Sequence, residues 1–206
     1  MINLNEIGVY SERIPKNIFE NIKSLVNTAS EDHNNELVGQ IEKELKINLN
    51  QHKDISEYLL KIVTKTNLFQ EYMVDLMKQN NKNFLNLKLV SSWINFQKEN
   101  EFNPLHTHDG IFSYIIFIKI PYSYEEQKKL FPKTRPTDIR CGTTCFLTAN
   151  RSARGGIVEN FLPLDFSYEG TIYFFKADKF HLVYPFYNTK EERITMSGNI
   201  DLNYDS

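Results

Sequence analysis

Residues 103–120 read NPLHTHDGIFSYIIFIKI, and this stretch carries the strongest structural signal in the chain. Its second half, from Phe112 to Ile120, is a nearly continuous run of β-branched and aromatic residues that ends before a proline. Such a run is typical of a strand that is buried on both faces. Its first half holds His106 and His108, and residues two apart on a strand point to the same face. The stretch therefore predicts a buried sheet with two imidazoles directed at one point.

A third histidine, His181, lies far downstream in another strand-like segment. Imidazole is a good ligand for iron, zinc and copper, and three protein ligands leave positions open for substrate and oxygen. We therefore expect His106, His108 and His181 to form a metal site, although a His-x-His pair alone is equally consistent with ordinary buried histidines. The two remaining histidines, His33 and His52, are expected to be ordinary residues.

The periodicity of the apolar residues predicts helices first and strands afterwards. In the first eighty residues, four segments have helical spacing, and Thr66 is a candidate cap for the last of them: 15–26, 37–45, 58–63 and 66–77. Further on the period is two or the segment is β-branched, and the expected strands are 85–96, 112–120, 143–147, 171–175, 181–186 and 192–200, the last two joined by a hairpin loop at 187–191. This order predicts an α+β fold. Its N-terminal helices (residues 1–82) pack on a double-stranded β-helix core of jelly-roll, cupin-like type (residues 83–206), and the whole forms a single structural domain.

Composition and charge indicate a cytoplasmic globular protein. The 206 residues are 41% hydrophobic and 24% charged, and the formal net charge of -2 gives no general attraction to nucleic acid or to anionic membranes. The first residues lack the basic and apolar regions of a signal peptide, and no apolar run has the length of a transmembrane helix. Cys141 and Cys145 are expected to be reduced, because further ligands at zinc-site spacing are missing and the cytosol is reducing.

The last predicted strand has a polar face that begins with Arg193. Arg193 and Thr195 share this face with two further polar residues, while apolar residues and a glycine occupy the other face. A guanidinium can bind a carboxylate through two parallel hydrogen bonds, and a neighbouring hydroxyl can add a third. The face is therefore a candidate receptor for a carboxylate. The alternative is a solvent-facing strand whose arginine pairs with Glu191 or Glu192.

In order and spacing, these segments resemble the 2-oxoglutarate- and iron(II)-dependent oxygenases, and especially the small prolyl-hydroxylase-like members that bacteriophages carry. The resembling segments are 93–97 (WINFQ), 101–110 (EFNPLHTHDG), 112–114 (FSY), 170–175 (GTIYFF), 181–186 (HLVYPF) and 192–200 (ERITMSGNI). The resemblance covers most of the second half of the chain and, more loosely, the helical first half.

This resemblance implies a non-haem iron(II) enzyme that uses dioxygen and 2-oxoglutarate. It would hydroxylate a C–H bond of a peptide or protein, of prolyl type, or of a small molecule, and release succinate and carbon dioxide. His106 and His181 would be iron ligands, and Arg193 would hold the distal carboxylate of 2-oxoglutarate with support from Thr195. A phage-encoded enzyme of this kind would act in the host cytoplasm. No nucleic-acid or membrane partner is expected.

One position departs from the pattern of the family, which has Asp or Glu where this chain has His108. Three arrangements remain open. His106, His108 and His181 can form a three-histidine site, Gly110 can take the carboxylate position after His108 in a two-histidine site, or a bulge can bring Asp109 to the metal. The i, i+2 spacing favours the first. A vacant ligand position could accept chloride, so halogenation stays open beside hydroxylation.

Two further residues and two further functions complete the expectations. Asn95 and Tyr114 are candidates for hydrogen bonds to the co-substrate. A cupin-like metal dioxygenase or hydrolase without 2-oxoglutarate is one alternative, because three histidines also suit a catalytic zinc. A non-catalytic jelly-roll protein with a structural or binding role is the other. Arg193 separates them, because it has an obvious role only where a dicarboxylate binds, while the non-catalytic alternative predicts a solvent-facing His106.

Overall fold

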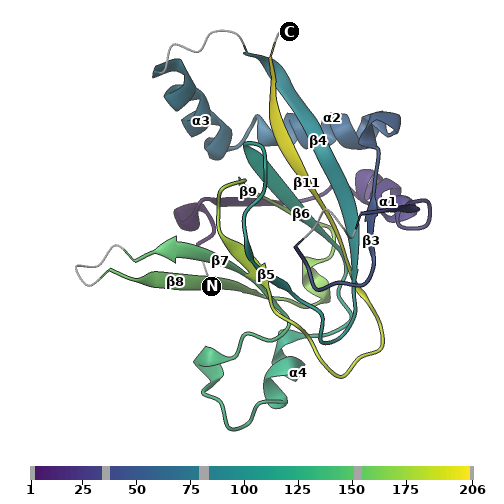
Figure 1. Ribbon diagram of the computed structural model, residues 1–206, viewed down its shortest axis with the longest axis vertical. Helices are drawn as coiled ribbons and strands as arrows, with labels where there is room; N and C mark the ends of the chain where they lie inside the picture. Colours follow the sequence, from purple (N-terminus) through teal and green to yellow (C-terminus); the bar gives the residue numbers. More distant parts are fainter. Residues whose placement is uncertain (1–2, 34–37, 79–83, 151–154, 205–206) are drawn as a thin grey trace.

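Two antiparallel β-sheets form the centre of the computed structural model, which describes residues 3–33, 38–78, 84–150 and 155–204 (Figure 1). The larger sheet has seven strands, in the order β1 (Val9–Arg13), β9 (Thr171–Lys176), β6 (Phe112–Lys119), β11 (Arg193–Tyr204), β4 (Phe84–Gln97), β3 (Glu44–Lys46) and β2 (Glu31–Asp32). The smaller sheet has four, in the order β5 (Asn103–His106), β10 (His181–Val183), β7 (Thr143–Ala149) and β8 (Ile157–Pro163). Together they form a double-stranded β-helix.

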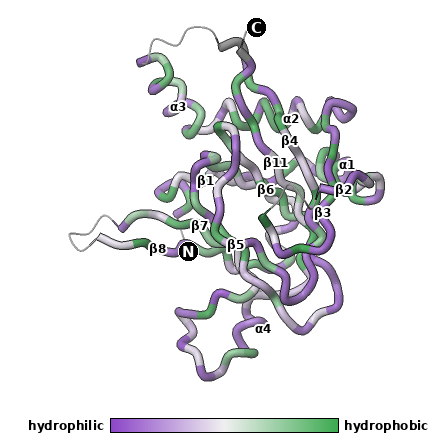
Figure 2. Tube along the Cα trace, in the orientation of Figure 1, coloured by the Kyte–Doolittle hydropathy of each residue, from purple (hydrophilic) through white to green (hydrophobic). Residues whose placement is uncertain are grey.

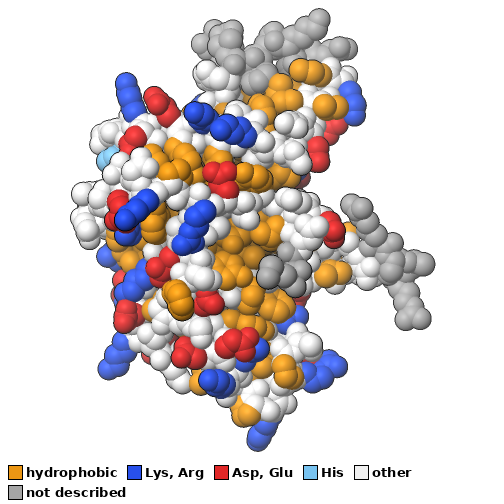
Figure 3. All heavy atoms as spheres, turned by 180° about the vertical axis from the view of Figure 1, so that it is seen from behind, with side chains coloured by type: hydrophobic (Ala, Val, Ile, Leu, Met, Phe, Trp, Pro, Cys, Tyr) orange, Lys and Arg blue, Asp and Glu red, His pale blue; other side chains and the backbone are white. Residues whose placement is uncertain are grey.

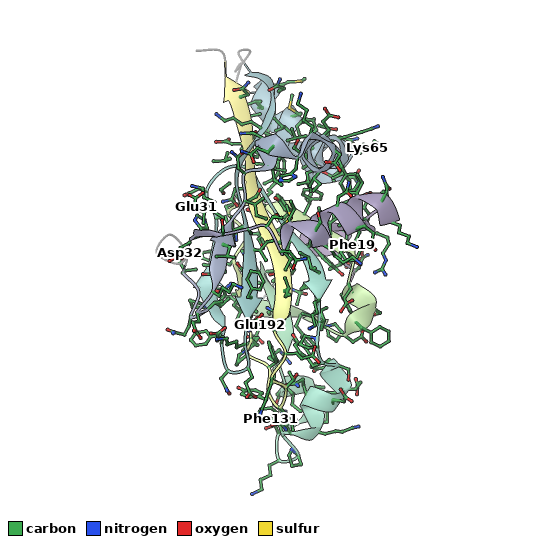
Figure 4. All side chains as sticks on the ribbon, turned by 90° about the vertical axis from the view of Figure 1, so that its right-hand side faces the viewer. Phe19, Glu31, Asp32, Lys65, Phe131 and Glu192 are labelled. Carbon is green, nitrogen blue, oxygen red and sulfur yellow. The ribbon has the colours of Figure 1, made fainter. Side chains whose placement is uncertain are left out.

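Helices cover only one face of the larger sheet (Figures 1 and 4). Figure 4 shows Phe19 and Lys65 on the helical side of this sheet, with Glu31 and Asp32 in its edge strand β2. The helices are α1 (Lys16–Leu25), α2 (Lys53–Val63), α3 (Asn67–Lys78) and, in the loop after β6, α4 (Tyr124–Lys129). Short 3-10 turns lie at Asn5–Ile7, Leu49–Gln51, Pro136–Asp138 and Phe166–Tyr168. The other face of the sheet is left for the smaller sheet.

Strand β6 shows how one sequence pattern serves two cores. Tyr114 and Ile116 pack in the cluster that the helices form with the larger sheet. Ile115 and Phe117 point the other way, into the cluster between the two sheets. All four side chains are buried, and full burial of each large apolar side chain contributes about 1.5–3 kcal/mol. The predicted strand buried on both faces is therefore confirmed, and its inward face borders the space between the sheets.

Three of the four predicted helices are confirmed as α1, α2 and α3. Thr66 caps α3 as expected, since its hydroxyl accepts a hydrogen bond from the backbone N–H of Phe69 at 3.2 Å. The helix predicted over 37–45 is wrong within the described residues. Gln40 pairs with Phe102 in an isolated bridge, and β3 begins at Glu44. Pairing with β4 decides this segment, because a few apolar residues at helical spacing are a weak signal against a neighbouring strand.

The N-terminal segment is thus more than a set of helices. Its strand β1 pairs with β9, and its strand β3 pairs with β4, so that it extends the larger sheet at both edges. The predicted division at residues 82 and 83 stays a prediction. Residues on the two sides of this division are joined by backbone hydrogen bonds within the larger sheet.

The six predicted strands are confirmed, but one predicted connection is wrong. Strands β10 and β11 were expected to form a hairpin around residues 187–191. In the structure β10 pairs with β5 and β7, whereas β11 pairs with β4 and β6, so the connection crosses from one sheet to the other. Strands β1, β2, β3 and β8 were not predicted. The strand expected to carry both His106 and His108 is β5, which ends at His106, so that His108 lies just beyond it. Sequence periodicity indicates strands, but it does not name their partners.

The distribution of residue types follows the layers. Figure 2 shows hydrophobic residues along the central strands and a mainly hydrophilic loop region around α4. Figure 3 shows basic and acidic side chains interspersed over the face seen from behind. In the described part of the chain, no helix has both the length and the apolar character needed to cross a membrane.

A substitution at Gly198 tests how closely β11 packs against β4 and Tyr114. A Cβ at this position would lie 2.5 Å from the backbone oxygen of Ser91 and 2.5 Å from the hydroxyl of Tyr114. We expect Gly198→Ala to lower the free energy of unfolding by about 1–3 kcal/mol, because the neighbouring strand has to shift. Urea unfolding followed by circular dichroism measures this change.

The matched control is Val90→Ala on β4, whose side chain is exposed. It should change the free energy of unfolding by less than about 0.5 kcal/mol. Equal midpoints for Gly198→Ala and the unsubstituted protein would contradict the close approach of β11 to Tyr114.

Candidate active site

The smaller sheet and the loop that follows its strand β5 bring His106, His108 and His181 together. His106 ends β5, His181 begins β10, and His108 lies just beyond the end of β5. Strands β5 and β10 are antiparallel neighbours, and His106 is paired in register with His181. Their ring centroids are 4.2 Å apart, and the ring of His108 lies 4.9 Å from each of them. One ring nitrogen from each residue lies within 4.8 Å of those of the other two. Three nitrogen donors therefore converge on one point, as a tridentate metal site requires.

Backbone carbonyls orient two of the three imidazoles. His106 Nδ1 lies 2.7 Å from the carbonyl oxygen of Pro104, and His181 Nδ1 lies 2.9 Å from that of Lys179. A carbonyl only accepts, so each Nδ1 carries the proton and each Nε2 presents a lone pair. His181 Nε2 faces His108 Nε2 at 3.1 Å. Fixing the tautomer through the other ring nitrogen is how proteins orient histidine ligands.

The surroundings keep these imidazoles neutral. Burial lowers the pKa of His106 below its ordinary value. Burial, with the repulsion between neighbouring histidine charges, lowers the pKa of His108 and of His181 to about 3. Neutral imidazole is the form that binds a metal, so the site needs no deprotonation at neutral pH.

A cavity of about 320 Å³ lies between the histidines and the polar face of the larger sheet. Arg193 lines it and is only 3% exposed. One guanidinium nitrogen, Nη1, donates a hydrogen bond to the hydroxyl of Tyr122 at 3.1 Å, while its Nε has no hydrogen-bond partner. A buried guanidinium is stabilised by an anion beside it, so the cavity is a candidate receptor for an anion.

The pairing of Arg193 with Glu191 or Glu192 is not found. Glu191 instead forms an ion pair with Lys119 at 2.6 Å, and among the residues that the structure describes no carboxylate pairs with Arg193. Tyr122 was missed by the sequence analysis. It lies 71 residues from Arg193, just beyond the end of β6, and no motif connects the two.

The other predicted residues divide between the two faces of the sheet. Thr195 and Asn95 line the cavity, and Asn95 Oδ1 has no hydrogen-bond partner. Tyr114 lies on the opposite face, where its hydroxyl shares a hydrogen bond of 2.7 Å with Ser92. We therefore remove Tyr114 from the candidate site. Side chains alternate between the two faces of β6, so the position of Tyr114 in the strand places it on the helical side.

His33, expected to be an ordinary residue, also lines the cavity. Its ring centroid lies 5.8 Å from that of Trp93, and the ring of Trp93 lies 5.6 Å from that of His108. Trp93 and His33 therefore form a wall beside the three-histidine cluster. No sequence signal pointed to His33, because it comes from the short segment next to β2.

Cys141 and Cys145 are both free thiols. Burial raises the pKa of Cys141, and it raises that of Cys145 to about 12, so that both remain protonated at neutral pH. A protonated thiol is a poor nucleophile and a poor metal ligand. The expectation that they are ordinary reduced cysteines agrees with their place in the core.

A family model described as "Putative 2OG-Fe(II) oxygenase" matches residues 91–199, which is more than half of the chain. The chain belongs to the 2OG-Fe(II) oxygenases. This membership identifies an enzyme that uses iron(II), 2-oxoglutarate and dioxygen. It also removes the two alternatives, a metal enzyme without 2-oxoglutarate and a non-catalytic jelly-roll protein. No curated protein sequence matches this oxygenase.

Three solved structures share the fold of this 2OG-Fe(II) oxygenase. A prolyl-4-hydroxylase from Pseudomonas putida is 10% identical, with 99% of this chain and 96% of that chain covered and a TM-score of 0.51. An oxidoreductase of the 2OG-Fe(II) oxygenase family from Burkholderia pseudomallei is 14% identical (96% and 86% covered, TM-score 0.55). A prolyl hydroxylase from Trichoplax adhaerens, in complex with a hypoxia inducible factor oxygen degradation domain peptide fragment, is 12% identical (98% and 86%, TM-score 0.50). At such identities the likeness shows the fold alone.

The lowered pKa values of His108 and His181 predict how acid affects the metal-free protein. Between pH 6.5 and about 3 the unfolded chain binds more protons at these residues than the folded chain does. Their contribution to the free energy of unfolding therefore decreases as the pH falls. Glu44 acts in the opposite direction, because its pKa is raised to about 7. A comparison of variants separates the contribution of the histidines to the free energy of unfolding from that of Glu44.

We expect His108→Gln to make the loss of unfolding free energy between pH 7 and pH 5 smaller by about 1–2 kcal/mol. Urea unfolding of the metal-free proteins at several pH values measures it. Thr107→Ala is the control, since this exposed residue carries no titrating group. Identical pH profiles for His108→Gln and the control would contradict the buried, neutral state of His108.

Proposed function

We propose that this oxygenase hydroxylates a C–H bond of a peptide or protein side chain, prolyl residues included, or of a small molecule, with iron held by His106, His108 and His181 and 2-oxoglutarate held by Arg193. One observation carries the proposal. A buried guanidinium with an unpartnered Nε lines the same cavity as three converging neutral imidazoles. The Trichoplax adhaerens relative, solved with a peptide fragment, supports a peptide as the substrate class.

The donor set fits iron(II). Three neutral imidazole nitrogens within 4.8 Å of one another can bind one face of an ion and leave the other positions for the co-substrate and oxygen. Bound iron(II) supplies the activation of dioxygen, one atom of which enters the substrate C–H bond while the other enters succinate as 2-oxoglutarate loses carbon dioxide. The chain contributes orientation and a dry surrounding.

Arg193 and its neighbours fit the distal carboxylate of 2-oxoglutarate. Tyr122 accepts one N–H of the guanidinium and fixes its plane, so that the remaining N–H groups are available to the carboxylate. Burial raises the pKa of Tyr122, which keeps the phenol neutral. Thr195 supplies a hydroxyl two residues along the same strand face, and Asn95 supplies an amide from the neighbouring strand.

Apolar side chains exclude water around the reacting groups. Ile115 and Phe117 of β6 and Val183 of β10 line the cavity between the histidines and the polar strand face. In such a low-dielectric space the attraction between Arg193 and a carboxylate is stronger than in water. The exclusion of water by these side chains also limits side reactions in the cavity.

His108 is the better candidate for the third ligand. Its Nε2 lies 3.1 Å from His181 Nε2, whereas Asp109 is exposed and lies outside the group of converging donor atoms. With His108 bound, the position that could accept chloride is filled. This favours hydroxylation over halogenation.

Anaerobic titration tests the proposal. Addition of iron(II) and then 2-oxoglutarate to the metal-free protein should produce a visible absorption band, followed in air by succinate formation. Arg193→Met should weaken 2-oxoglutarate binding about 10–100-fold, because a charge-assisted hydrogen-bonded pair is lost, and should leave iron binding intact. Arg13→Met, on an exposed arginine of β1, is the matched control. Unchanged 2-oxoglutarate affinity in Arg193→Met would sink the assignment.

Iron affinity of three alanine variants separates the ligand arrangements. His108→Ala and His181→Ala should each lose more than about 100-fold in iron(II) affinity, beyond the loss typical of residues that only orient a ligand. Asp109→Ala should change it by less than about threefold, because its carboxylate lies outside the cluster. Competition with a fluorescent metal chelator measures these affinities. Loss of iron in Asp109→Ala, with His108→Ala intact, would favour the bulged arrangement instead.

A further inference from the structure

One wall of the cavity adjoins Arg193, whose partner across the β11–β4 pair is Gln97, and its other polar residues have not been assigned to iron or 2-oxoglutarate. It is formed where β3 and β4 meet the start of β5, and its polar residues are Glu44, Gln97 and Asn103. Gln97 is 1% exposed, and its Oε1 has no hydrogen-bond partner. Its Nε2 donates to the carbonyl oxygen of Glu101 at 2.5 Å, which fixes the orientation of the amide. The atom left over for the cavity is therefore an acceptor.

Asn103 presents a second buried acceptor, since its Oδ1 also has no partner. Gly39 lies directly beside this oxygen. A Cβ at Gly39 would lie 2.1 Å from Asn103 Oδ1 and 3.4 Å from Glu44 Oε1, so both oxygens border the same small volume. The φ angle of Gly39 is not positive, so the backbone does not require glycine there. The Asn103 amide instead occupies the place that a side chain at position 39 would take, so only glycine allows this close approach.

The charge of this wall is negative or neutral. Glu44 is 1% exposed, and burial, together with the charge of Glu101, raises its pKa to about 7. Among the described residues that line the cavity, Arg193 is the one lysine or arginine. The proposed function assigns it to 2-oxoglutarate. The carboxyl of Glu44 attracts a cation that donates hydrogen bonds to it and to the two amide oxygens, and it would repel a carboxylate ligand.

We propose that Glu44, Gln97 and Asn103 bind an N–H-bearing cation, an ammonium or a guanidinium group, of the primary substrate. The substrate of this oxygenase is then a peptide or small molecule with a basic side chain or amine, in or beside the unit that is oxidised. An ammonium has three donors and no acceptor, which matches a wall of acceptors. This inference rests on the proposed function for the identity of the chemistry, but its binding site is made of different residues.

Trp93 provides a direct measure of binding, because it is the sole tryptophan of the chain and lines the cavity. The probes are N-acetyl-arginine amide and N-acetyl-lysine amide, with the neutral isosteres N-acetyl-citrulline amide and N-acetyl-norleucine amide. Each is titrated without oxygen into the metal-free protein and into protein loaded with manganese(II) and 2-oxoglutarate. We expect each cationic probe to bind at least about tenfold more tightly than its neutral isostere, as for a buried charge-assisted pair.

Two variants and a control assign this preference to the wall. Glu44→Gln keeps the size of the side chain and removes its charge, and should reduce the preference to less than about twofold. Gly39→Ala places a methyl group where Asn103 Oδ1 lies, so that the amide has to move, and should weaken all four probes about tenfold or more while 2-oxoglutarate still binds. Glu42→Gln is the matched control, because this carboxylate is largely exposed and pairs with Lys98, and it should keep the full preference.

The outcomes separate this inference from the proposed function. Equal binding of cationic and neutral probes by a protein that still binds 2-oxoglutarate overturns the cation site and leaves the oxygenase assignment in place. A cationic preference that depends on Glu44 supports the site even where Arg193 proves not to bind 2-oxoglutarate. Calcium that displaces the arginine probe at micromolar concentration would show that the wall is a metal site and would also overturn the inference.

Discussion

Desolvation of polar groups between two sheets is the constraint on which the rest of this structure depends. The larger sheet directs Arg193, Thr195, Asn95 and Gln97 away from water, and the smaller sheet closes over them with its histidines. Polar groups in such a place are costly unless a partner satisfies them. The unpartnered N–H of Arg193 is suited to an anion, and the converging imidazole nitrogens are suited to a metal ion.

The helices and the N-terminal strands make this arrangement rigid. Helices α1, α2 and α3 bury the outer face of the larger sheet, and the cavity with the three histidines lies on its inner face. Strand β3 extends this sheet beyond β4 and brings Glu44 to the cavity wall. A site built on paired strands holds its groups more precisely than one built on loops.

Membership of the 2OG-Fe(II) oxygenases accounts for the metal and the co-substrate, but it does not account for the whole cavity. The histidine at position 108 differs from the acidic residue of the family pattern, and the structure places its nitrogen beside that of His181. The acceptor wall around Gln97 and Asn103 is a property of this chain's own residues. Substrate choice is therefore to be sought in the β3–β4 wall, away from the conserved chemistry of iron and 2-oxoglutarate.

The sequence by itself determined six of the described strands, three helices, the spacing of His106 and His108, and the polar face that begins with Arg193, because these depend on local periodicity and residue type. Only the tertiary structure decided which strands pair. It placed His181 opposite His106, put β10 and β11 in different sheets, turned residues 37–45 away from a helix, and joined Tyr122 to Arg193. It also sent Tyr114 to the helical core and His33 to the cavity. Contacts between residues far apart in the chain arise from packing and burial, and local sequence patterns do not predict them.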